Sequence, residues 1–357
     1  MAGKGLIWAV CKDPGGTNGV LPVVDELRKI GYEVLLIANG NALERLPTMN
    51  IPFLTLEEAL AKSTIPDIFL TSMCYQGGVG RNLIPLMRSA GVPVITLQDF
   101  WGAQLKPEWE DRKFRPRFVC ANDEVGADII QRAWPGFHRS CIEITGFPAM
   151  DKYASLDVGG TSKKVREGLG IPADGKVVLY CDQIDYAGEV LTELVESLNS
   201  LGRNDIYFIP RMHPRLPKDN PDGFPKFQEA MKLFRAGTLI ADSSRFTTSE
   251  VITAATVVLS MYSTVNIEAS CIRKQNISML YPDYGMGLFL KGANGIMDEF
   301  PLVSLGCSTK VTNRQELVAA LTESLGSGLG LVSAQEKAFQ LDGKNAFRVA
   351  NLVKHAC

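Results

Sequence analysis

The sequence predicts an α/β protein made of two Rossmann-like, doubly wound domains that face a central cleft. Short apolar runs rich in β-branched residues alternate with amphipathic segments, a pattern typical of parallel strands connected by helices. This alternation extends over 357 residues, which is more than one hydrophobic core usually covers. Because ligands of such sheets bind at the carboxyl ends of the strands, the candidate functional residues should directly follow strands.

The first half of the chain alternates strands and helices up to residue 145. Apolar residues at helical spacing predict a helix over residues 21–30, and Gly31 ends it. The other expected helices cover residues 82–90 and 126–133. The expected strands cover residues 5–10, 33–38, 66–71, 92–97, 118–121 and 142–145.

The second half follows a hydrophilic stretch, residues 151–166. Residues 189–201 form an expected helix, and residues 217–227, rich in Pro, Asp, Gly and Lys, predict a surface loop. The expected strands cover residues 177–181, 205–210, 238–241, 256–260 and 276–280. We expect domains at residues 1–155 and 168–333. A closing helix over residues 335–354, within the segment 334–357, could pack back on the first domain.

Charge and cysteine pattern exclude several classes of protein. A formal charge of −2 gives no long-range attraction for nucleic acid or an anionic membrane. The apolar runs are too short for a transmembrane helix or a signal peptide. The eight cysteines form no CxxC pair, so the thiols are expected to be buried and no metal site is expected. These features predict a soluble, cytoplasmic protein.

The first candidate motif, DPGGTNG, begins at Asp13, directly after the first strand. Pro14 fixes one backbone angle, and Gly15 and Gly16 allow a tight turn and close approach of a ligand. The motif is neither GxGxxG nor a Walker A sequence, which disfavours dehydrogenases and P-loop kinases. Asp13 is a candidate general base for an acceptor hydroxyl. An ordinary strand-to-helix turn, with Asp13 as the helix cap, remains the alternative.

The second candidate motif, RMHPR, follows the strand DIYFIP. Pro214 ends that strand, so the side chains of Arg211 and His213 should point into the cleft. Imidazole and guanidinium together suit a diphosphate and can offset the charge that develops on a leaving phosphate. The alternative is a solvated basic loop.

The third candidate motif, LSMYSTVNIEA, contains Tyr262, Ser263 and Thr264 at the end of an apolar run and Glu268 one helical turn later. A strand that ends in small hydroxyl residues before a helix is suited to bind an anion through the first backbone N–H groups of that helix. A phosphate there and a diol near the carboxylate would together describe a nucleotide. The alternative is a Ser- or Thr-capped helix with a surface glutamate.

The order of these motifs resembles the C-terminal domain of GT-B fold enzymes. That group includes nucleotide-sugar glycosyltransferases, UDP-N-acetylglucosamine 2-epimerases and the glycerophosphotransferases of teichoic acid synthesis, which use CDP-glycerol. The resemblance implies that His213 and the turn at Tyr262, Ser263 and Thr264 hold the donor phosphates. It implies that Glu268 binds the ribose hydroxyls. The stretch VVLYCDQ, which ends at Gln183, resembles the strand and loop that approach the nucleotide.

The N-terminal half resembles the same enzymes through DPGGTNGVLPVVDELRKIGYEV and through short strand-end motifs. Asp99, Trp101, Asp123 and Glu124 lie at strand ends on the acceptor side, where each could assist proton transfer or shape a sugar pocket. The alternative for each is a helix cap or a partly buried polar residue, and Trp101 could also belong to the core. In the 2-epimerases a glycine pair stands where this chain has Ser263 and Thr264, which disfavours a true 2-epimerase.

The resemblance implies an enzyme that transfers a sugar or a related group from a nucleotide-activated donor to a hydroxyl acceptor. Arg211 and His213 would offset the charge of the leaving group, while Asp13, or else Asp99, would deprotonate the acceptor. The nucleotide-sugar donor is the substrate, and we expect no cofactor or metal, since the chain has no DxD triplet. Two alternatives remain: a nucleotide-sugar epimerase or hydrolase, and a non-catalytic nucleotide-binding protein.

Overall fold

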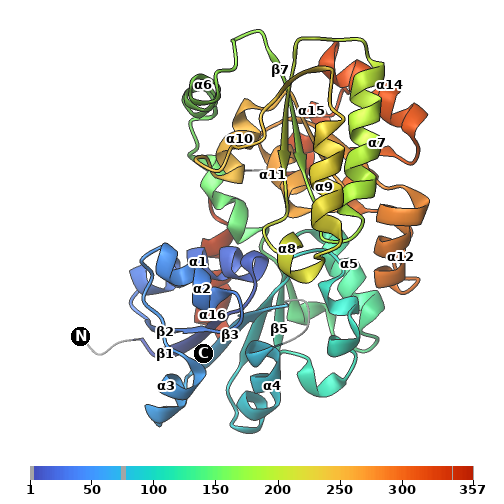
Figure 1. Ribbon diagram of the computed structural model, residues 1–357. Helices are drawn as coiled ribbons and strands as arrows, with labels where there is room; N and C mark the ends of the chain where they lie inside the picture. The colour runs from blue at the N-terminus through green and yellow to red at the C-terminus, as the bar shows by residue number, and fades with distance from the viewer. Residues whose placement is uncertain (1–3, 74–77, 340, 357) are drawn as a thin grey trace. The chain divides into compact units, whose positions relative to one another are not determined.

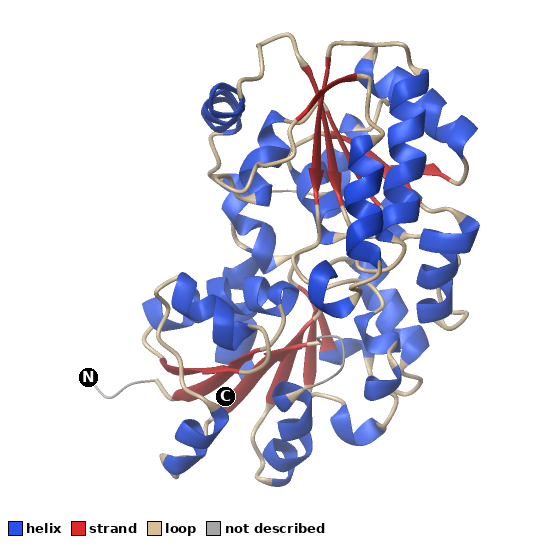
Figure 2. Cartoon of the chain, in the orientation of Figure 1, coloured by secondary structure: helices blue, strands red, loops and turns tan. Residues whose placement is uncertain are grey.

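The computed structural model describes residues 4–73, 78–339 and 341–356, and the chain divides into two compact units (Figure 1). Unit 1 consists of Met1–Ser155, Gly292–Met297 and Leu341–Cys357, and unit 2 of Leu156–Lys291 and Asp298–Gln340. Within the described residues each unit holds one six-stranded sheet whose strand pairs are all parallel. Helices flank the strands in both units (Figure 2). The predicted fold, two Rossmann-like α/β domains, is confirmed.

The sheet of unit 1 has the strand order β2-β1-β3-β4-β5-β6. Its strands are β1 (Leu6–Cys11), β2 (Glu33–Ala38), β3 (Ile68–Ser72), β4 (Val94–Leu97), β5 (Phe118–Ala121) and β6 (Ile142–Ile144). Its helices are α1 (Pro14–Lys29), α2 (Ala42–Thr48), α3 (Leu56–Ala61), α4 (Val79–Ser89), α5 (Glu124–Ala133) and α16 (Asn345–Ala356). The strand β2 lies on one side of β1, and β3 lies on the other side. The strand order therefore reverses between β1 and β3.

Helices on both faces explain why β1 is an almost continuous apolar run. Ile7 and Ala9 are buried in one cluster with residues of α1 and α16, whereas Trp8 and Val10 are buried in a second cluster with residues of α4. Successive side chains of a strand point to opposite faces, so a strand covered on both sides needs apolar residues at every position. The C-terminal helix α16 contributes Val349 and neighbouring apolar residues to the first of these clusters.

The sheet of unit 2 has the order β12-β11-β10-β7-β8-β9, and this order reverses between β7 and β10. Its strands are β7 (Lys176–Cys181), β8 (Ile206–Arg211), β9 (Gly237–Leu239), β10 (Val257–Ser260), β11 (Gln275–Met279) and β12 (Thr309–Val311). The helices from residue 156 to residue 339 are α6 (Val158–Leu169), α7 (Ala187–Ser200), α8 (Leu216–Asp219), α9 (Gly223–Lys232), α10 (Thr248–Ala254), α11 (Thr264–Cys271), α12 (Gly287–Ala293), α13 (Pro301–Ser304), α14 (Arg314–Leu325) and α15 (Val332–Ala338).

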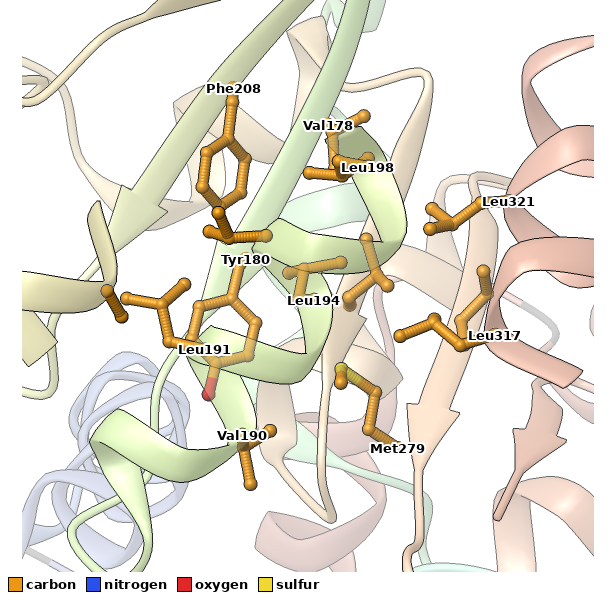
Figure 3. Close-up of a cluster of buried hydrophobic side chains, with 14 of the residues drawn as sticks. Val178, Tyr180, Val190, Leu191, Leu194, Leu198, Phe208, Met279, Leu317 and Leu321 are labelled. Atoms are coloured by element: carbon orange, nitrogen blue, oxygen red, sulfur yellow. The ribbon is translucent and has the colours of Figure 1, made fainter. Parts of the chain in front are cut away.

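One face of this second sheet packs on α7 and α14. Figure 3 shows Val178 and Tyr180 of β7 facing Leu194 of α7, with Leu317 of α14 beside them, and all four side chains are fully buried. The alternate residues of β7, such as Leu179, belong to a different cluster that includes residues of α10. Burial on both faces fixes the register of β7 and therefore the position of the residues that follow it.

Two sequence predictions about this region were wrong. Residues 217–227 do not form a surface loop, because they contribute α8 and the start of α9. Pro217 occupies the first turn of α8, where proline is tolerated, and Phe227 of α9 is buried, 2% exposed, in the cluster shown in Figure 3. The single closing helix over residues 335–354 was also wrong, since α15 and α16 are separate helices.

The predicted burial of the thiols holds for most of the described cysteines. Buried side chains are those of Cys11, Cys120, Cys181, Cys271 and Cys307, whereas Cys141 is partly exposed. Cys74 and Cys357 lie outside the described residues. Among the helices that the structure describes, none combines the length and apolar character needed to cross a membrane.

Candidate functional site

Three neighbouring strands of unit 2 end side by side at the point where the strand order reverses. Cys181, the last residue of β7, pairs with Arg211 at the end of β8, and β10 lies on the other side of β7. The Asp182 N–H donates to the Arg211 carbonyl at 2.9 Å, and the Gln183 amide donates to the Tyr262 carbonyl at 3.3 Å. All three segments singled out in the second half of the sequence therefore meet at one edge, where ligands of such sheets bind.

His213 presents one defined nitrogen at this edge. Its Nδ1 accepts a hydrogen bond from the Arg215 backbone N–H at 3.2 Å, so the neutral ring carries its proton on Nε2. Partial burial, followed by the charge of Arg215, lowers the pKa of His213 below its usual value. At neutral pH the side chain is therefore an uncharged donor, Nε2–H, which is suited to hydrogen-bond a phosphate oxygen.

Arg211, predicted to contact a phosphate, is held by the protein itself. Its Nη1 donates to the Phe246 carbonyl at 2.9 Å and to the carbonyl and hydroxyl of Ser243, each at 3.3 Å. These bonds fasten the segment before α10 to the end of β8. Contact of the remaining guanidinium N–H groups with a phosphate stays a prediction.

Tyr262, Ser263 and Thr264 form the junction between β10 and α11. Ser263 has an extended backbone and caps the helix, since its hydroxyl accepts the Val265 N–H at 3.3 Å, while Thr264 is the first helical residue. The capping alternative is thus correct for Ser263. It is compatible with an anion site, because the first turn of α11 faces the edge where β7 and β8 end. The ring of Tyr262 lies 5.6 Å from that of Phe289.

Glu268 is not the surface glutamate of the alternative interpretation. Its side chain is 9% exposed, and its Oε2 accepts a hydrogen bond from the Ser249 hydroxyl at 2.8 Å. A buried carboxylate requires such partners. Ser249 belongs to α10, so two helices position this carboxylate one turn beyond the start of α11.

Asp182 is a candidate that the sequence analysis missed. It is 5% exposed, its Oδ1 accepts from the Tyr180 hydroxyl at 2.9 Å, and within the described part of the chain its buried Oδ2 has no hydrogen-bond partner. Burial raises the pKa of Asp182 to about 7, against the opposing effect of the Tyr180 hydrogen bond. An acidic residue directly after a buried strand is the same signal that identified Asp13, and it could have found Asp182 too.

In unit 1, Asp13 caps α1 at the point where the strand order reverses. Its Oδ1 accepts the Gly16 N–H at 2.8 Å, so the capping alternative is correct, and its role as a base stays a prediction. The predicted tight turn was wrong, because Gly15 and Gly16 belong to the first turn of α1 and neither has a positive φ. The need for glycine at position 16 is steric: a Cβ there would lie 2.0 Å from the Ser72 Oγ.

Asp99 lies close to Asp13 across Gly15. A Cβ on Gly15 would be 3.5 Å from Asp99 Oδ2 and 3.9 Å from Asp13 Oδ1. Burial and then the charge of Asp13 raise the pKa of Asp99 well above its usual value. Asp99 therefore keeps its proton to higher pH than an ordinary aspartic acid, whereas Asp13 accepts the Gly16 N–H at the start of α1.

The other acceptor-side candidates have structural roles. Trp101 is 2% exposed and belongs to the core, and its Nε1 donates to both carboxylate oxygens of Asp123 at 3.1 and 3.0 Å. Asp123 caps α5 by accepting the Gly126 N–H at 2.6 Å. Glu124 is exposed and pairs with Arg139 at 3.2 Å. Within the described residues, no group of three or more His, Cys, Asp or Glu side chains is arranged to hold a metal ion.

The steric argument for position 16 gives a testable result. Gly16→Ala should lower the free energy of unfolding by about 1–3 kcal/mol, because the added methyl group displaces Ser72 or the start of α1. Gly19→Ala is the matched control in the same helix. Its Cβ would meet only Leu97 Cδ1, at 3.7 Å, so it should keep or raise the stability. Equal effects of the two substitutions, measured by urea unfolding, would contradict the close packing at Gly16.

Several solved structures are similar to this chain in architecture. No protein-family model and no curated protein sequence matches the chain. A UDP-GlcNAc 2-epimerase from Neisseria meningitidis, bound to UDP-GlcNAc, is similar in structure with a TM-score of 0.69 and 14% identity, over 98% of this chain and 99% of that one.

Two further solved structures are similar to this chain over nearly its whole length. HepE from Anabaena, in complex with UDP-glucose, aligns with a TM-score of 0.64 at 13% identity, over 98% of this chain and all of that one. The wall teichoic acid polymerase TagF, in a variant soaked with CDPG, aligns with a TM-score of 0.61 at 13% identity, over 98% of this chain and 88% of that one. With two six-stranded Rossmann-like units and these structural relatives, the chain has the GT-B fold.

Proposed function

We propose that the chain is an enzyme that transfers a sugar, or a related group, from a nucleotide-activated donor to a hydroxyl acceptor. The observation that carries this proposal is the gathering of three groups at the carboxyl edge of unit 2. They are the neutral His213 donor, the start of α11 at Ser263 and Thr264, and the buried Glu268 carboxylate. A phosphate donor, an anion site and a carboxylate suited to ribose hydroxyls are the elements that a nucleotide diphosphate requires.

Each of these groups has a role in the proposed transfer. The bond from the sugar carbon to the donor phosphate breaks, and the departing electron pair stays on the diphosphate. His213 Nε2–H hydrogen-bonds the diphosphate and stabilises the added charge. The acceptor oxygen forms the new bond to that carbon, and a carboxylate takes its proton. The proposed base is Asp13 of unit 1, and Asp99 is only a second candidate because its raised pKa favours the protonated form.

The similar structures support a nucleotide-bound substrate. The Neisseria epimerase structure contains UDP-GlcNAc, the HepE structure contains UDP-glucose, and the TagF variant was soaked with CDPG. An epimerase and a polymerase occur among them on one fold, so the fold alone does not select an activity. The choice of a transferase therefore depends on the residues of this chain.

Donor turnover with and without an acceptor tests the proposal. The full chain is incubated with a panel of UDP-, GDP-, CDP- and CMP-activated sugars and polyols, each alone and with a pool of hydroxyl acceptors. Release of the nucleotide only when an acceptor is present is the expected result. Conversion of a donor without an acceptor would favour a second candidate, an epimerase or hydrolase. Binding of a nucleotide without any turnover would indicate a non-catalytic nucleotide-binding protein.

One observation favours that second candidate. Asp13 and Asp99 flank Gly15, and burial and the charge of Asp13 raise the pKa of Asp99, so a single site holds two carboxyl groups of which Asp99 is suited to act as the acid. An epimerisation removes a proton from carbon and returns one, which such a pair can do without an acceptor. The panel separates the two reactions, because only the transfer depends on the added hydroxyl compound.

Glu268 provides a test of nucleotide binding that does not depend on turnover. Glu268→Ala should weaken the binding of the preferred nucleotide diphosphate by about 1–3 kcal/mol, because the ribose hydroxyls lose a charged acceptor. Ser249→Ala should have a smaller effect, since it removes a hydrogen bond to the carboxylate but leaves the carboxylate itself. Calorimetry on the folded variants measures both. Unchanged affinity of Glu268→Ala would refute the ribose role.

A further inference from the structure

A pocket of about 470 Å³ opens in unit 1, and four arginines line it. Arg88 comes from the last turn of α4, Arg112 from a short 3₁₀ turn, and Arg115 and Arg117 from the segment that leads into β5. Among the described residues that line the pocket there is no Asp or Glu. In the described residues none of the four guanidinium groups forms an ion pair, although the chain as a whole has more acidic than basic residues.

The pocket lies where β4 begins, whereas Asp13 and Asp99 lie where the strands of unit 1 end. The Arg117 N–H donates to the carbonyl of Val94, the first residue of β4, at 2.9 Å, whereas Asp99 follows the other end of that strand. The four residues of β4 span roughly 13 Å. The four arginines therefore do not belong to the site built around Asp13 and Asp99.

Two of the four guanidinium groups, those of Arg88 and Arg115, are held by carbonyl oxygens, which do not neutralise them. Arg88 Nη1 donates to the carbonyls of Arg112 and Arg115 at 3.3 and 3.4 Å, and Arg115 Nη1 donates to the Pro135 carbonyl at 3.4 Å. Arg115 lies 5.6 Å from the Trp134 ring, and its buried Nε has no hydrogen-bond partner in the described part of the chain. Carbonyl oxygens orient these cations but leave their charge uncompensated, and Arg115 keeps an unused donor.

Arg112 lies close enough to Arg115 to act on its charge. Burial, followed by the charge of Arg112, lowers the pKa of Arg115. Like charges that lie close together repel each other, and a bound anion removes this repulsion. Arg112 and Arg117 are exposed, and each guanidinium can offer a planar fork of N–H donors to an oxyanion.

We propose that this pocket is a second ligand site, which binds the phosphate or pyrophosphate group of a small soluble organic phosphate. Four cations without carboxylate partners match a multivalent anion, and guanidinium forks match phosphate oxygens. The volume is that of a small-molecule site. The prolines at 93, 116 and 135 and the half-buried Phe137 provide an apolar wall for the organic part of the ligand.

Hydrogen exchange on the full chain, with pyrophosphate as the probe, locates binding to this pocket. Pyrophosphate should slow the exchange of residues 112–118 and 134–137, whereas sodium chloride at matched ionic strength should not. The double substitution of Arg112→Gln with Arg117→Gln should abolish this protection, and both side chains are exposed, so the fold should persist. Any protection near His213, from binding to the nucleotide site, should remain in the double variant.

The chain offers a matched control beside the pocket. Lys113→Gln removes the same charge from the neighbouring residue, but Lys113 pairs with Asp111 at 2.8 Å and does not line the pocket. Protection in this variant should equal that of the wild type. The proposal is overturned if pyrophosphate gives no protection at residues 112–118, or if the double variant keeps it. Co-sedimentation with phosphatidic acid vesicles, without an effect of pyrophosphate, would indicate a membrane surface instead.

Discussion

His213→Asn is expected to lower kcat/KM for the donor by about 10²–10³-fold, because removing one hydrogen-bond donor from developing charge has an effect of that size. Asparagine can still accept the Arg215 N–H through its side-chain oxygen, so the local turn should persist. What it cannot supply is an N–H at the position of Nε2. The measurement uses the donor that turns over in the panel, with the rate taken below saturation.

The chain contains a matched control for this substitution. His138 in unit 1 accepts the Ser140 N–H through Nδ1 at 3.3 Å, which is the same local geometry at an exposed position. His138→Asn should leave kcat/KM unchanged within about twofold. His213→Gln, which restores an N–H near Nε2, should recover part of the activity. A His213→Asn variant as active as the His138→Asn variant would remove His213 from the mechanism.

The α/β fold could be predicted because buried parallel strands leave a clear pattern. The run at β1 is apolar at every position, as double-sided burial demands, and the expected strands lie within two residues of the observed ones. The four-residue helix α8 and the helix α9 were missed because Pro217 and Gly223 are typical of loops. Tertiary packing of Phe227 against the cluster of α7 stabilises this segment as helix, and no local pattern shows that contact.

For the candidate site, sequence order identified which strand ends carry functional groups but not how each side chain is used. Arg211 was expected on a phosphate, yet three of its hydrogen bonds fasten the loop before α10. These partners lie more than 30 residues away in the sequence, so spacing alone could not reveal them. Trp101 and Asp123 are also far apart in the sequence. They form a hydrogen bond because β4, which precedes Trp101, pairs with β5, which precedes Asp123.

Asp182→Asn is expected to remove a pH dependence of stability worth about 4 kcal/mol. The pKa of Asp182 is about 7 in the folded chain, against an ordinary value of 3.8. Well below pH 3.8 the carboxyl is protonated in both the folded and the unfolded state. As the pH rises from 4 to 7, the unfolded chain releases this proton while the folded chain keeps it. The folded state therefore loses about 1.4 kcal/mol per pH unit over that range.

Urea unfolding of the wild type and of Asp182→Asn at pH 4, 6 and 8 measures this loss. The difference in unfolding free energy should change by about 4 kcal/mol in favour of the variant as the pH rises, since the other groups titrate in both proteins and cancel. Tyr180→Phe, which removes the hydrogen bond to Oδ1, should extend the loss to higher pH. Parallel stability curves for wild type and Asp182→Asn would show that the buried carboxyl titrates normally.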